Sequence, residues 1–461
     1  MERVNFKQVK KIISGNIFRL LDKGSFRKQK IIRIQAPCPD IDCFSWLRAQ
    51  TSENKLYLAD RNGEFEVAGV GIADLIKGDE KCDYGKLFSS LHQGVSGENK
   101  YLRYYGGLSF YNRKSAKEWD AFGSYCFIIP QFEVFKIKGK AFFAFNIRAD
   151  HINSLTIKKS LEDLEGIMFS IEAFEGDIPS VSSLRNFPDR FAWERIFNAK
   201  IRASGKMLFD KIVLARKTSI DFEREVDPLV LFSRLRAYAK ESFSYYFQPA
   251  NGIAFLGVTP ERLFKRNGLL VESEALAGTK PRGKNEIEDI SHQQKLSSSV
   301  KEDLEHRYVV DWIKNALSSL CSTLEPLGAR SILKVPSALH LLTGFKGKLK
   351  KRISDADILS ALHPTPAVGG YPLNKALAAI IKIEPFDRGW YTGPIGFVGY
   401  DYADFAVALR CALVRGKNVS LFAGAGIVEG STAEDEWQEI ENKNSIYMRI
   451  LVGQSKELSA V

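Results

Sequence analysis

Residues 423–443 read AGAGIVEGSTAEDEWQEIENK, and this stretch indicates more about the fold than any other part of the chain. Its apolar start and its glycines predict a strand that ends in a turn. Gly424 and Gly426 are expected to expose backbone N–H groups that bind an anion. Ser431, followed three residues later by Glu434, is typical of a capping box at the start of a helix. The stretch therefore predicts a strand, a turn and a helix in succession.

One face of that helix carries charged residues where apolar residues are expected. Glu436, Glu439 and Lys443 are spaced i, i+3 and i+7, so they share a helix face. The same face continues with Ile446, Tyr447 and Ile450. Ionised groups are costly to bury unless they are paired or hold an ion. An ordinary i,i+4 ion pair between Glu439 and Lys443 is one explanation, and a binding site inside the protein is the other.

A second acidic helix face favours the binding site. Residues 297–317 read SSSVKEDLEHRYVVDWIKNAL, and the serines at the start of this segment can cap a helix. Glu302 and Glu305 then share one face with the apolar residues Val309, Trp312 and Ile313. Two such faces can form the walls around a hard divalent cation. Because no His or Cys cluster accompanies these carboxylates, Mg²⁺ is favoured over Zn²⁺.

The overall composition is that of a globular protein and disfavours several classes. The chain has 461 residues, of which 45% are hydrophobic and 26% are charged, and its net charge is +11. Its Lys and Arg residues are dispersed without a recognisable binding motif, so no nucleic-acid partner is expected. No apolar run approaches the ~20 residues of a membrane span, so no membrane association is expected. The six cysteines are scattered, which predicts reduced thiols rather than a disulfide framework.

The N-terminal segment is basic, but it does not have the pattern of a signal peptide. It lacks an apolar core and a cleavage site, and we therefore expect a cytoplasmic protein. Because the segment is poor in acidic residues, an amphipathic transit peptide is the alternative.

From residue 101 onward, the sequence predicts antiparallel strands with helices between them. The KGK turn at residues 138–140 separates two strand patterns, and Asn267-Gly268 is a strong hairpin signal. Residues 153–209 predict helices instead. This arrangement is typical of an α+β fold rather than a doubly wound parallel sheet. We expect one continuous domain over residues 101–452, with 1–100 as the N-terminal portion of the same fold and 453–461 as a tail.

Several motifs occur in the order found in one enzyme family. They are KIVLAR (211–216), TPERL (259–263), EALAGT (274–279), KEDLEH (301–306), LHLLTG (339–344), HPTPAVGGYP (363–372), WYTGPIG (390–396), ALRCALV (408–414) and AGAGIV (423–428). On these motifs the chain resembles the chorismate-utilising enzymes, and among them most closely the isochorismate synthases. The resemblance implies a single α+β domain of two large antiparallel sheets surrounded by helices.

The resemblance also implies a reaction. A Mg²⁺-dependent isomerase of this kind converts chorismate to isochorismate by adding water at C2 while the C4 hydroxyl leaves. Lys211 would be the general base, which requires a neutral amine. Glu261 would be the general acid, and burial would raise the pKa of this carboxyl group as that role requires.

Residues that hold the metal and the substrate follow from the same resemblance. The metal ligands would be Glu305 and Glu439, with Glu302 and Glu436 acting through water. The substrate contacts would be Gly278, Thr279, His340, Tyr391, Arg410, Gly424 and Lys443. Arg410, Tyr391 and the N–H of Gly424 would hold the enolpyruvyl carboxylate of chorismate, and Lys443 would pair with its ring carboxylate.

Relatives with other chemistry are the alternatives. A salicylate synthase resembles this chain in the same base, acid and metal residues, and it then eliminates pyruvate. Enzymes of the family that add ammonia usually lack a lysine at the position of Lys211. Ala277 stands where aminodeoxychorismate synthases resemble one another in having a nucleophilic lysine. No glutaminase partner is therefore expected, and the resemblance favours a monomer whose product enters quinone, siderophore or salicylate biosynthesis.

Overall fold

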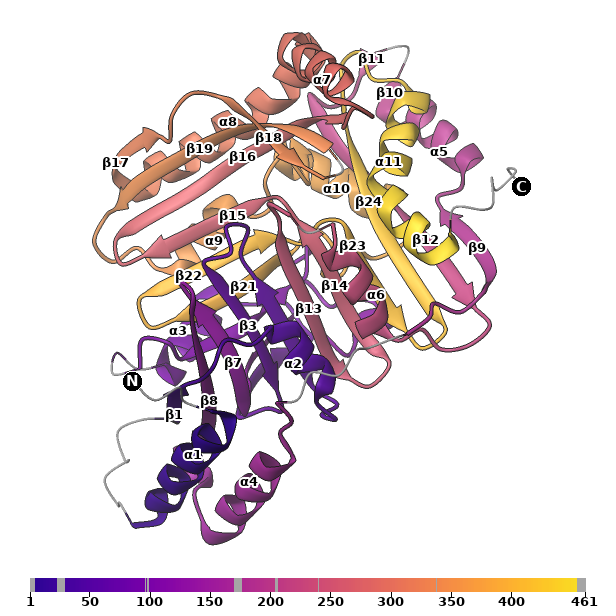
Figure 1. Cartoon of the computed structure of the whole chain (residues 1–461). Helices are drawn as coiled ribbons and strands as arrows, with labels where there is room; N and C mark the ends of the chain where they lie inside the picture. Colours follow the sequence, from indigo (N-terminus) through magenta and orange to yellow (C-terminus); the bar gives the residue numbers. More distant parts are fainter. Residues whose placement is uncertain are drawn as a thin grey trace.

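The strands form two large antiparallel sheets (Figure 1). The computed structural model describes residues 5–22, 30–95, 97, 99–169, 176–203, 206–238, 240–336 and 338–453. Within these residues, sheet A has 12 strands, sheet B has 10, and all pairings in both sheets are antiparallel. The predicted α+β fold with two large antiparallel sheets is confirmed.

Sheet A combines strands from the beginning, the middle and the end of the chain. In spatial order it comprises β1 (Ile31–Pro37), β8 (Lys140–Arg148), β7 (Phe132–Ile137), β3 (Phe65–Val70), β2 (Lys55–Ala59), β13 (Phe243–Ala250), β14 (Ile253–Thr259), β23 (Cys411–Arg415), β24 (Asn418–Val428), β12 (Lys211–Phe222) and β20 (Gly370–Tyr371), with β9 (Val181–Phe187) also paired with β12.

Sheet B is built in the same mixed way. In spatial order it comprises β17 (Cys321–Pro326), β19 (Ala338–Leu349), β16 (Leu270–Pro281), β15 (Arg262–Asn267), β22 (Tyr402–Val407), β21 (Pro394–Gly399), β5 (Arg103–Leu108), β6 (Tyr125–Ile129) and β4 (Asp74–Gly78), with β18 (Ser331–Val335) also paired with β19. The short strands β10 (Arg202–Ala203) and β11 (Lys206–Met207) pair separately from both sheets.

Helices cover the sheets and connect their strands. They are α1 (Phe6–Asp22), α2 (Cys43–Ala49), α3 (Tyr84–Gly94), α4 (Ser154–Gly166), α5 (Arg190–Ile196), α6 (Pro228–Arg236), α7 (Glu286–Ser298), α8 (Val300–Leu320), α9 (Asp355–Leu362), α10 (Leu373–Ile383) and α11 (Ala433–Val452). Two of them carry the acidic faces: α8 packs on β16 of sheet B, and α11 packs on β24 of sheet A (Figure 1).

Local turn chemistry explains two of the hairpins. Asn267 and Leu270 are paired across the β15–β16 turn, where Gly268 has a φ of +59° that favours glycine. Residues 138 and 139 both have positive φ between β7 and β8, so the KGK signal also marks a tight hairpin. Both predicted turns are confirmed.

Two local predictions were wrong. The cap of α11 is Thr432, whose Oγ1 accepts a hydrogen bond from the N–H of Asp435. The hydroxyl of Ser431 instead accepts a hydrogen bond from the N–H of Val428, so it closes the turn after β24. The region predicted as helical, 153–209, contains the strand β9, because its residues pair with the edge of β12.

The N-terminal portion is interleaved with the rest of the fold. Strands β1, β2 and β3 belong to sheet A, and β4 belongs to sheet B. Of the predicted tail, residues 454–461 lie outside the described residues, as do parts of the basic N-terminal segment. In the part of the chain that the structure describes, no helix is long and apolar enough to cross a membrane.

Candidate active site

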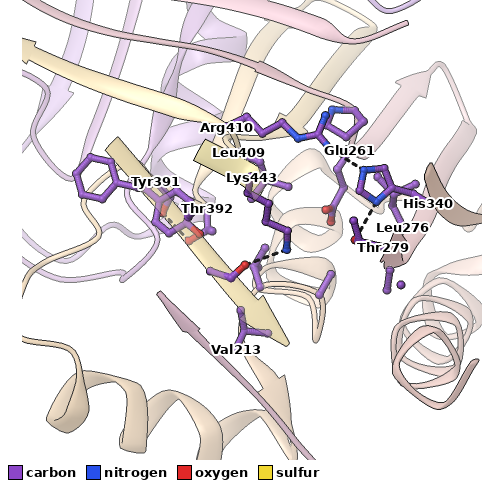
Figure 2. A pocket seen from close by; sticks show the side chains of 18 of the residues that line it. Val213, Glu261, Leu276, Thr279, His340, Tyr391, Thr392, Leu409, Arg410 and Lys443 are labelled. Carbon is purple, nitrogen blue, oxygen red and sulfur yellow. Dashed lines mark hydrogen bonds between the residues drawn. The ribbon is translucent and has the colours of Figure 1, made fainter. Parts of the chain in front are cut away.

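A cavity between the two sheets brings most of the predicted site residues together (Figure 2). Sheet B contributes β16 and β19, sheet A contributes β24, and the helices α8 and α11 contribute one charged side chain each. The predicted residues that line it are Glu261, Gly278, Thr279, Glu305, His340, Tyr391, Arg410, Gly424 and Lys443. Apolar lining comes from residues that were not predicted as site residues: Val213, Leu276, Val368, Leu409 and Phe422.

Glu261 is a buried carboxyl group at the start of β15. Burial raises its pKa from 4.5 to about 8; the positive charges of Lys211 and Lys443 oppose this shift, and the negative charge of Glu274 adds to it. Its backbone N–H donates to Thr259 Oγ1 at 3.3 Å. Glu261 therefore holds a proton at neutral pH, as a general acid must.

Lys211 lies one layer behind the cavity, at the first residue of β12. Its side chain is fully buried, and its Nζ is 3.1 Å from Glu305 Oε1. This contact is an ion pair without hydrogen-bond alignment. Glu305 lines the cavity and Lys211 does not, so the carboxylate of Glu305 separates the amine from the space for a substrate.

Gly426 provides the space for this ion pair. A Cβ at this position would collide with Glu305 Oε1, and it would lie 3.0 Å from Glu305 Cδ and 3.2 Å from Lys211 Cε. The sequence predicts that the N–H groups of both Gly424 and Gly426 bind an anion. The structure gives Gly426 a different role, which is the close approach of a carboxylate to β24.

Gly426→Ala is therefore expected to displace Glu305 from Lys211 and to lower kcat/KM by about 100-fold, the cost of a displacement of roughly 1 Å in an active site. The matched control is Gly399→Ala in β21, where a Cβ would meet its nearest atoms at 3.5 Å, an ordinary contact distance. Steady-state kinetics and circular dichroism of both variants check this. Equal kcat/KM values in the two variants would contradict it.

His340 is held between two cavity residues. Arg410 Nη2 lies 2.6 Å from His340 Nε2, and Thr279 Oγ1 lies 3.1 Å from His340 Nδ1 (Figure 2). Because a guanidinium only donates, Nε2 accepts and Nδ1 carries the proton toward Thr279. Burial, Arg410 and Lys443 lower the pKa of His340 well below its ordinary value, which agrees with this neutral tautomer.

A β-bulge places Thr279 on the cavity. Ala277 pairs with Leu341 and Thr279 pairs with His340, so Gly278 is the extra residue in β16. Its φ of +76° is one that glycine adopts without strain. Alternation along a strand would not have predicted that these neighbouring residues both line the cavity.

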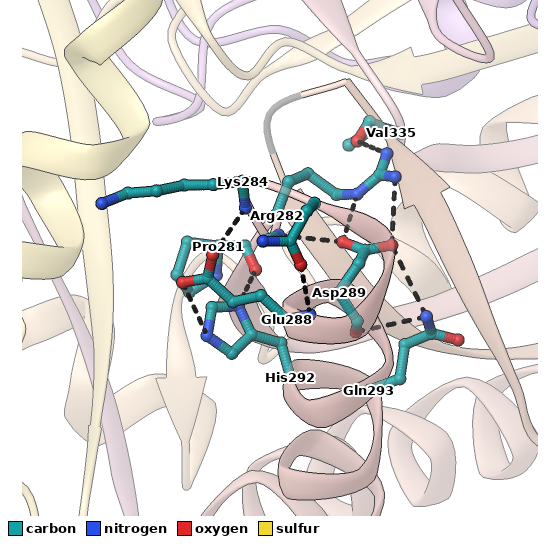
Figure 3. Close-up of polar contacts among 10 residues, drawn as sticks. Pro281, Arg282, Lys284, Glu288, Asp289, His292, Gln293 and Val335 are labelled. Atoms are coloured by element: carbon teal, nitrogen blue, oxygen red, sulfur yellow. Dashed lines mark hydrogen bonds and ion pairs between the residues drawn. The ribbon is translucent and has the colours of Figure 1, made fainter.

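The exit of β16 beyond Thr279 is fixed by a polar cluster at the start of α7 (Figure 3). Arg282 Nε donates to Asp289 Oδ1 at 2.7 Å, and the N–H of Gly283 donates to the same oxygen at 2.9 Å. His292 Nδ1 lies 2.9 Å from the carbonyl oxygen of Pro281, to which it donates. These contacts anchor the strand end that carries Thr279.

The opposite part of the cavity offers donors for an anion. Ala215 and Gly424 face each other across β12 and β24, but the N–H of Ala215 donates to Glu384 Oε1 instead. Gly424 therefore directs both backbone groups away from β12. Its carbonyl oxygen accepts a hydrogen bond from Lys443 Nζ at 2.9 Å. Its N–H lies on the same side of the strand as that carbonyl group. Tyr391 stacks on Phe422, and burial raises the pKa of its phenol.

Four carboxylates lie beside the cavity, and each is paired with a lysine. The pairs are Glu302 with Lys280 at 3.5 Å, Glu305 with Lys211 at 3.1 Å, Glu436 with Lys301 at 2.6 Å, and Glu439 with Lys443 at 2.6 Å. Glu302, Glu439 and three of the basic residues, Lys280, Lys301 and Lys443, line a second cavity that adjoins the first. Lys280 and Lys301 were not predicted as site residues, although Lys301 immediately precedes Glu302 in the KEDLEH motif.

The carboxylates repel one another, and a bound cation would reduce this electrostatic repulsion. Burial, Glu305 and Glu439 raise the pKa of Glu302, and burial and Glu439 raise the pKa of Glu436 to about 7. Glu436 Oε2 is buried without a hydrogen-bond partner. Within the described residues, no three His, Cys, Asp or Glu side chains converge as a ready-made metal site. The oxygen donors of these carboxylates nevertheless fit a hard cation such as Mg²⁺. Binding of the cation requires that the ion pairs between the carboxylates and the lysines open.

Comparison with known proteins agrees with the sequence motifs. The family described as "Chorismate binding enzyme" matches residues 18–452. The isochorismate synthase of Catharanthus roseus is 33% identical over 470 residues, which cover 91% of this chain and 81% of that protein. Isochorismate synthase 2 of Arabidopsis thaliana is 35% identical and covers 84% of this chain and 71% of its own length.

A solved structure extends the likeness to the fold. MenF, the menaquinone-specific isochorismate synthase from Escherichia coli, superposes with a TM-score of 0.84 at 28% identity, covering 95% of this chain and 99% of MenF. The relatives and the family match span both sheets and the cavity between them. The chain therefore belongs to the chorismate-binding enzymes, in the branch that contains the isochorismate synthases.

Proposed function

We propose that this protein is an isochorismate synthase, an isomerase that converts chorismate to isochorismate. The observation that carries the proposal is the protonated, buried Glu261 on a cavity that also presents Arg410 and Lys443. Chorismate has two carboxylates and a ring hydroxyl that must leave as water. A cavity with cationic donors for the carboxylates and one carboxylic acid for the leaving group suits that substrate.

The proposed reaction needs a general acid, Glu261, and a general base, Lys211. Glu261 donates its proton to the C4 hydroxyl, which leaves as water, and the double bonds of the ring shift. Lys211 removes a proton from the water that attacks C2. In this structure Lys211 is paired with Glu305, so that ion pair has to open and the ammonium has to release its proton before Lys211 acts as the base. His340 cannot replace either group because both of its ring nitrogens are engaged.

Substrate binding uses the donors on the cavity wall. Arg410, Tyr391 and the N–H of Gly424 hold the enolpyruvyl carboxylate, and arginine supplies a forked donor for it. Lys443 pairs with the ring carboxylate. The neutral His340 keeps the Arg410 guanidinium directed into the cavity, and Gly278 and Thr279 border the ring beside Glu261.

We propose Mg²⁺ as the cofactor, with Glu305 and Glu439 as ligands and with Glu302 and Glu436 acting through water. When bound, the cation would neutralise the ring carboxylate and withdraw electron density from the ring. Lys211 would act on water and Lys443 on the substrate.

Removal of Mg²⁺ with a chelator is expected to abolish turnover, and Glu436→Gln is expected to weaken Mg²⁺ binding by about 10- to 100-fold, the usual cost of losing an indirect ligand. The matched control is Glu441→Gln on the same helix, because Glu441 pairs with Arg216 at 2.6 Å. Isothermal titration calorimetry with MgCl₂ measures both. Equal Mg²⁺ affinities in the two variants would contradict the assignment of Glu436.

The experiment that tests the proposed function is product identification. Purified protein is incubated with chorismate and Mg²⁺, and the products are separated by chromatography. Isochorismate as the sole product supports the proposal. Salicylate with pyruvate would identify the alternative salicylate synthase, and an amino-substituted product formed with ammonium would identify the third branch of the family.

Further properties follow from the family as proposals. We propose a cytoplasmic monomer that needs no glutaminase subunit. The solved relative is named as menaquinone-specific, and this favours a quinone pathway over a siderophore pathway for the product.

A further inference from the structure

One edge of β12 has a gap at the level of the active site. β24 pairs with β12 from Lys211 to Asp221 on one side. On the other side, β20 pairs only with residues 211–212, and β9 pairs with residues 217–222. Among the described residues, no strand pairs with residues 213–216 on that side. Unpaired buried backbone groups are costly, so something other than a strand must satisfy them.

Two side chains occupy the place of the missing strand. The N–H of Ala215 donates to Glu384 Oε1 at 2.8 Å, and Arg388 Nη2 donates to the carbonyl oxygen of Val213 at 2.8 Å. Glu384 and Arg388 follow α10 directly in sequence, and their side chains are almost completely buried. They provide one acceptor and one donor along the strand edge, as a neighbouring strand would.

Every donor of the Arg388 guanidinium is used. Nε donates to Glu384 Oε2 at 2.8 Å, and Nη2 donates to Glu384 Oε1 at 2.5 Å as well as to Val213. Nη1 donates to the carbonyl oxygen of Val368 at 2.8 Å and makes a weaker contact of 3.5 Å with Thr392 Oγ1. A buried ion pair is tolerated when its hydrogen bonds are complete in this way.

The groups that this ion pair holds are parts of the cavity wall. Val213, Val368 and Thr392 line the cavity, whereas Glu384 and Arg388 do not. The N–H of Tyr391 donates to the carbonyl oxygen of Arg388 at 2.9 Å, and Thr392 has a φ of +62°, which a non-glycine residue adopts only under constraint.

We infer that Glu384 and Arg388 are positioning residues: their ion pair substitutes for a strand beside Lys211 and fixes the wall that carries Tyr391 and Thr392. An apolar pair of the same volume would fill the space, but it would leave the N–H of Ala215 and the carbonyl of Val213 without partners. The ion pair therefore determines geometry at the active site, and it acts through the backbone rather than on the substrate. Only its kinetic consequence rests on the proposed function.

The test compares Arg388→Lys and Glu384→Gln with a matched control, all in the full-length protein. Lysine keeps the charge but has one nitrogen, so it cannot satisfy Val213, Val368 and Glu384 together. The control is Arg33→Lys, because Arg33 and Glu133 form an equally buried ion pair at the far edge of sheet A. Kinetic constants per folded molecule and hydrogen exchange of peptides over 211–216 and 390–393 are measured for each variant.

We expect kcat/KM for chorismate to fall by about 10- to 100-fold in both test variants, with faster exchange in the two peptides. Arg33→Lys is expected to lower the melting temperature and to leave kcat, KM and these peptides unchanged. Unchanged kinetic constants in a folded test variant would overturn the inference, because they would show a purely structural role.

Other outcomes are also decisive. If Arg388→Lys does not fold, Glu384→Gln decides, because glutamine is isosteric and keeps the oxygen that accepts from Ala215. If the wild-type protein does not turn over chorismate, the proposed function is wrong. The hydrogen-exchange measurement still tests the positioning role of Glu384 and Arg388 in that case. Exchange in the two peptides that is no faster than in Arg33→Lys would then reject that role.

Discussion

Glu261→Gln is expected to lower kcat for isochorismate formation by about 100- to 10,000-fold, the range that general acid–base groups contribute. Glutamine has the shape of the protonated carboxyl group but has no proton that it can give to the C4 hydroxyl. The substrate contacts of Arg410 and Lys443 do not involve position 261, so KM is expected to change little. Steady-state kinetics with chorismate and Mg²⁺ measure both constants.

The pH dependence of the wild-type enzyme should report the same group. Glu261 works in its protonated form, and its pKa is raised to about 8. kcat/KM is therefore expected to fall as the pH rises through about 8, and Glu261→Gln is expected to lack this limb in its residual activity. A wild-type profile that is flat from about pH 7 to about pH 9 would contradict the acid role.

The same substitution is expected to stabilise the protein. The unfolded chain releases the Glu261 proton near pH 4.5, whereas the folded chain keeps it up to about pH 8. The contribution of this group to stability is therefore complete below pH 4.5 and is lost as the pH rises through 8, by about 5 kcal/mol in all at 1.36 kcal/mol per pKa unit. Glu261→Gln cannot ionise, so its melting temperature at pH 8 should exceed that of the wild type.

The control is Glu325→Gln, at an exposed position in sheet B. This substitution should change neither activity nor stability.

Lys211→Met and Lys211→Arg are both expected to lower kcat by about 100- to 10,000-fold, because neither variant provides a base. Methionine removes the amine, and arginine keeps the positive charge beside Glu305 but stays protonated. The pair of variants therefore separates two roles of Lys211: accepting a proton from water, and neutralising Glu305.

The matched control for Lys211 lies on the same strand. Lys217 is largely buried and pairs with Glu118 at 3.0 Å, away from the cavity, so Lys217→Met should keep the wild-type kcat. If Lys211→Arg is active and Lys211→Met is not, the base assignment is wrong and Lys211 serves only as the counter-charge of Glu305.

The fold could be predicted where local chemistry and tertiary structure agree. Asn267-Gly268 predicted a hairpin because the turn requires a positive φ that glycine supplies. The acidic stripe on α11 predicted an inward-facing site because its carboxylates share a helix face with apolar residues. The structure agrees, since Glu436 is fully buried. Strand β9 was missed because its sequence has no strong strand pattern, and it forms by pairing with β12.

The candidate site was predicted by its residue types but not by its spatial order. Sequence motifs gave the residues that line the cavity through their resemblance to one enzyme family, and not through composition or spacing. They could not show that Lys211 lies behind Glu305, since that depends on the absence of a side chain at Gly426. They also gave no reason to connect Arg388 with β12, because the gap between β20 and β9 exists only in the assembled sheet.

The most direct test of the mechanism is isotope incorporation from water. Chorismate is converted by the purified protein in the presence of Mg²⁺ in H₂¹⁸O, and the product is analysed by mass spectrometry. If Lys211 activates water for attack at C2 while Glu261 releases the C4 hydroxyl, each isochorismate molecule formed carries one ¹⁸O at C2. Unlabelled isochorismate would mean that the original hydroxyl migrates, and it would contradict the assigned roles of both residues.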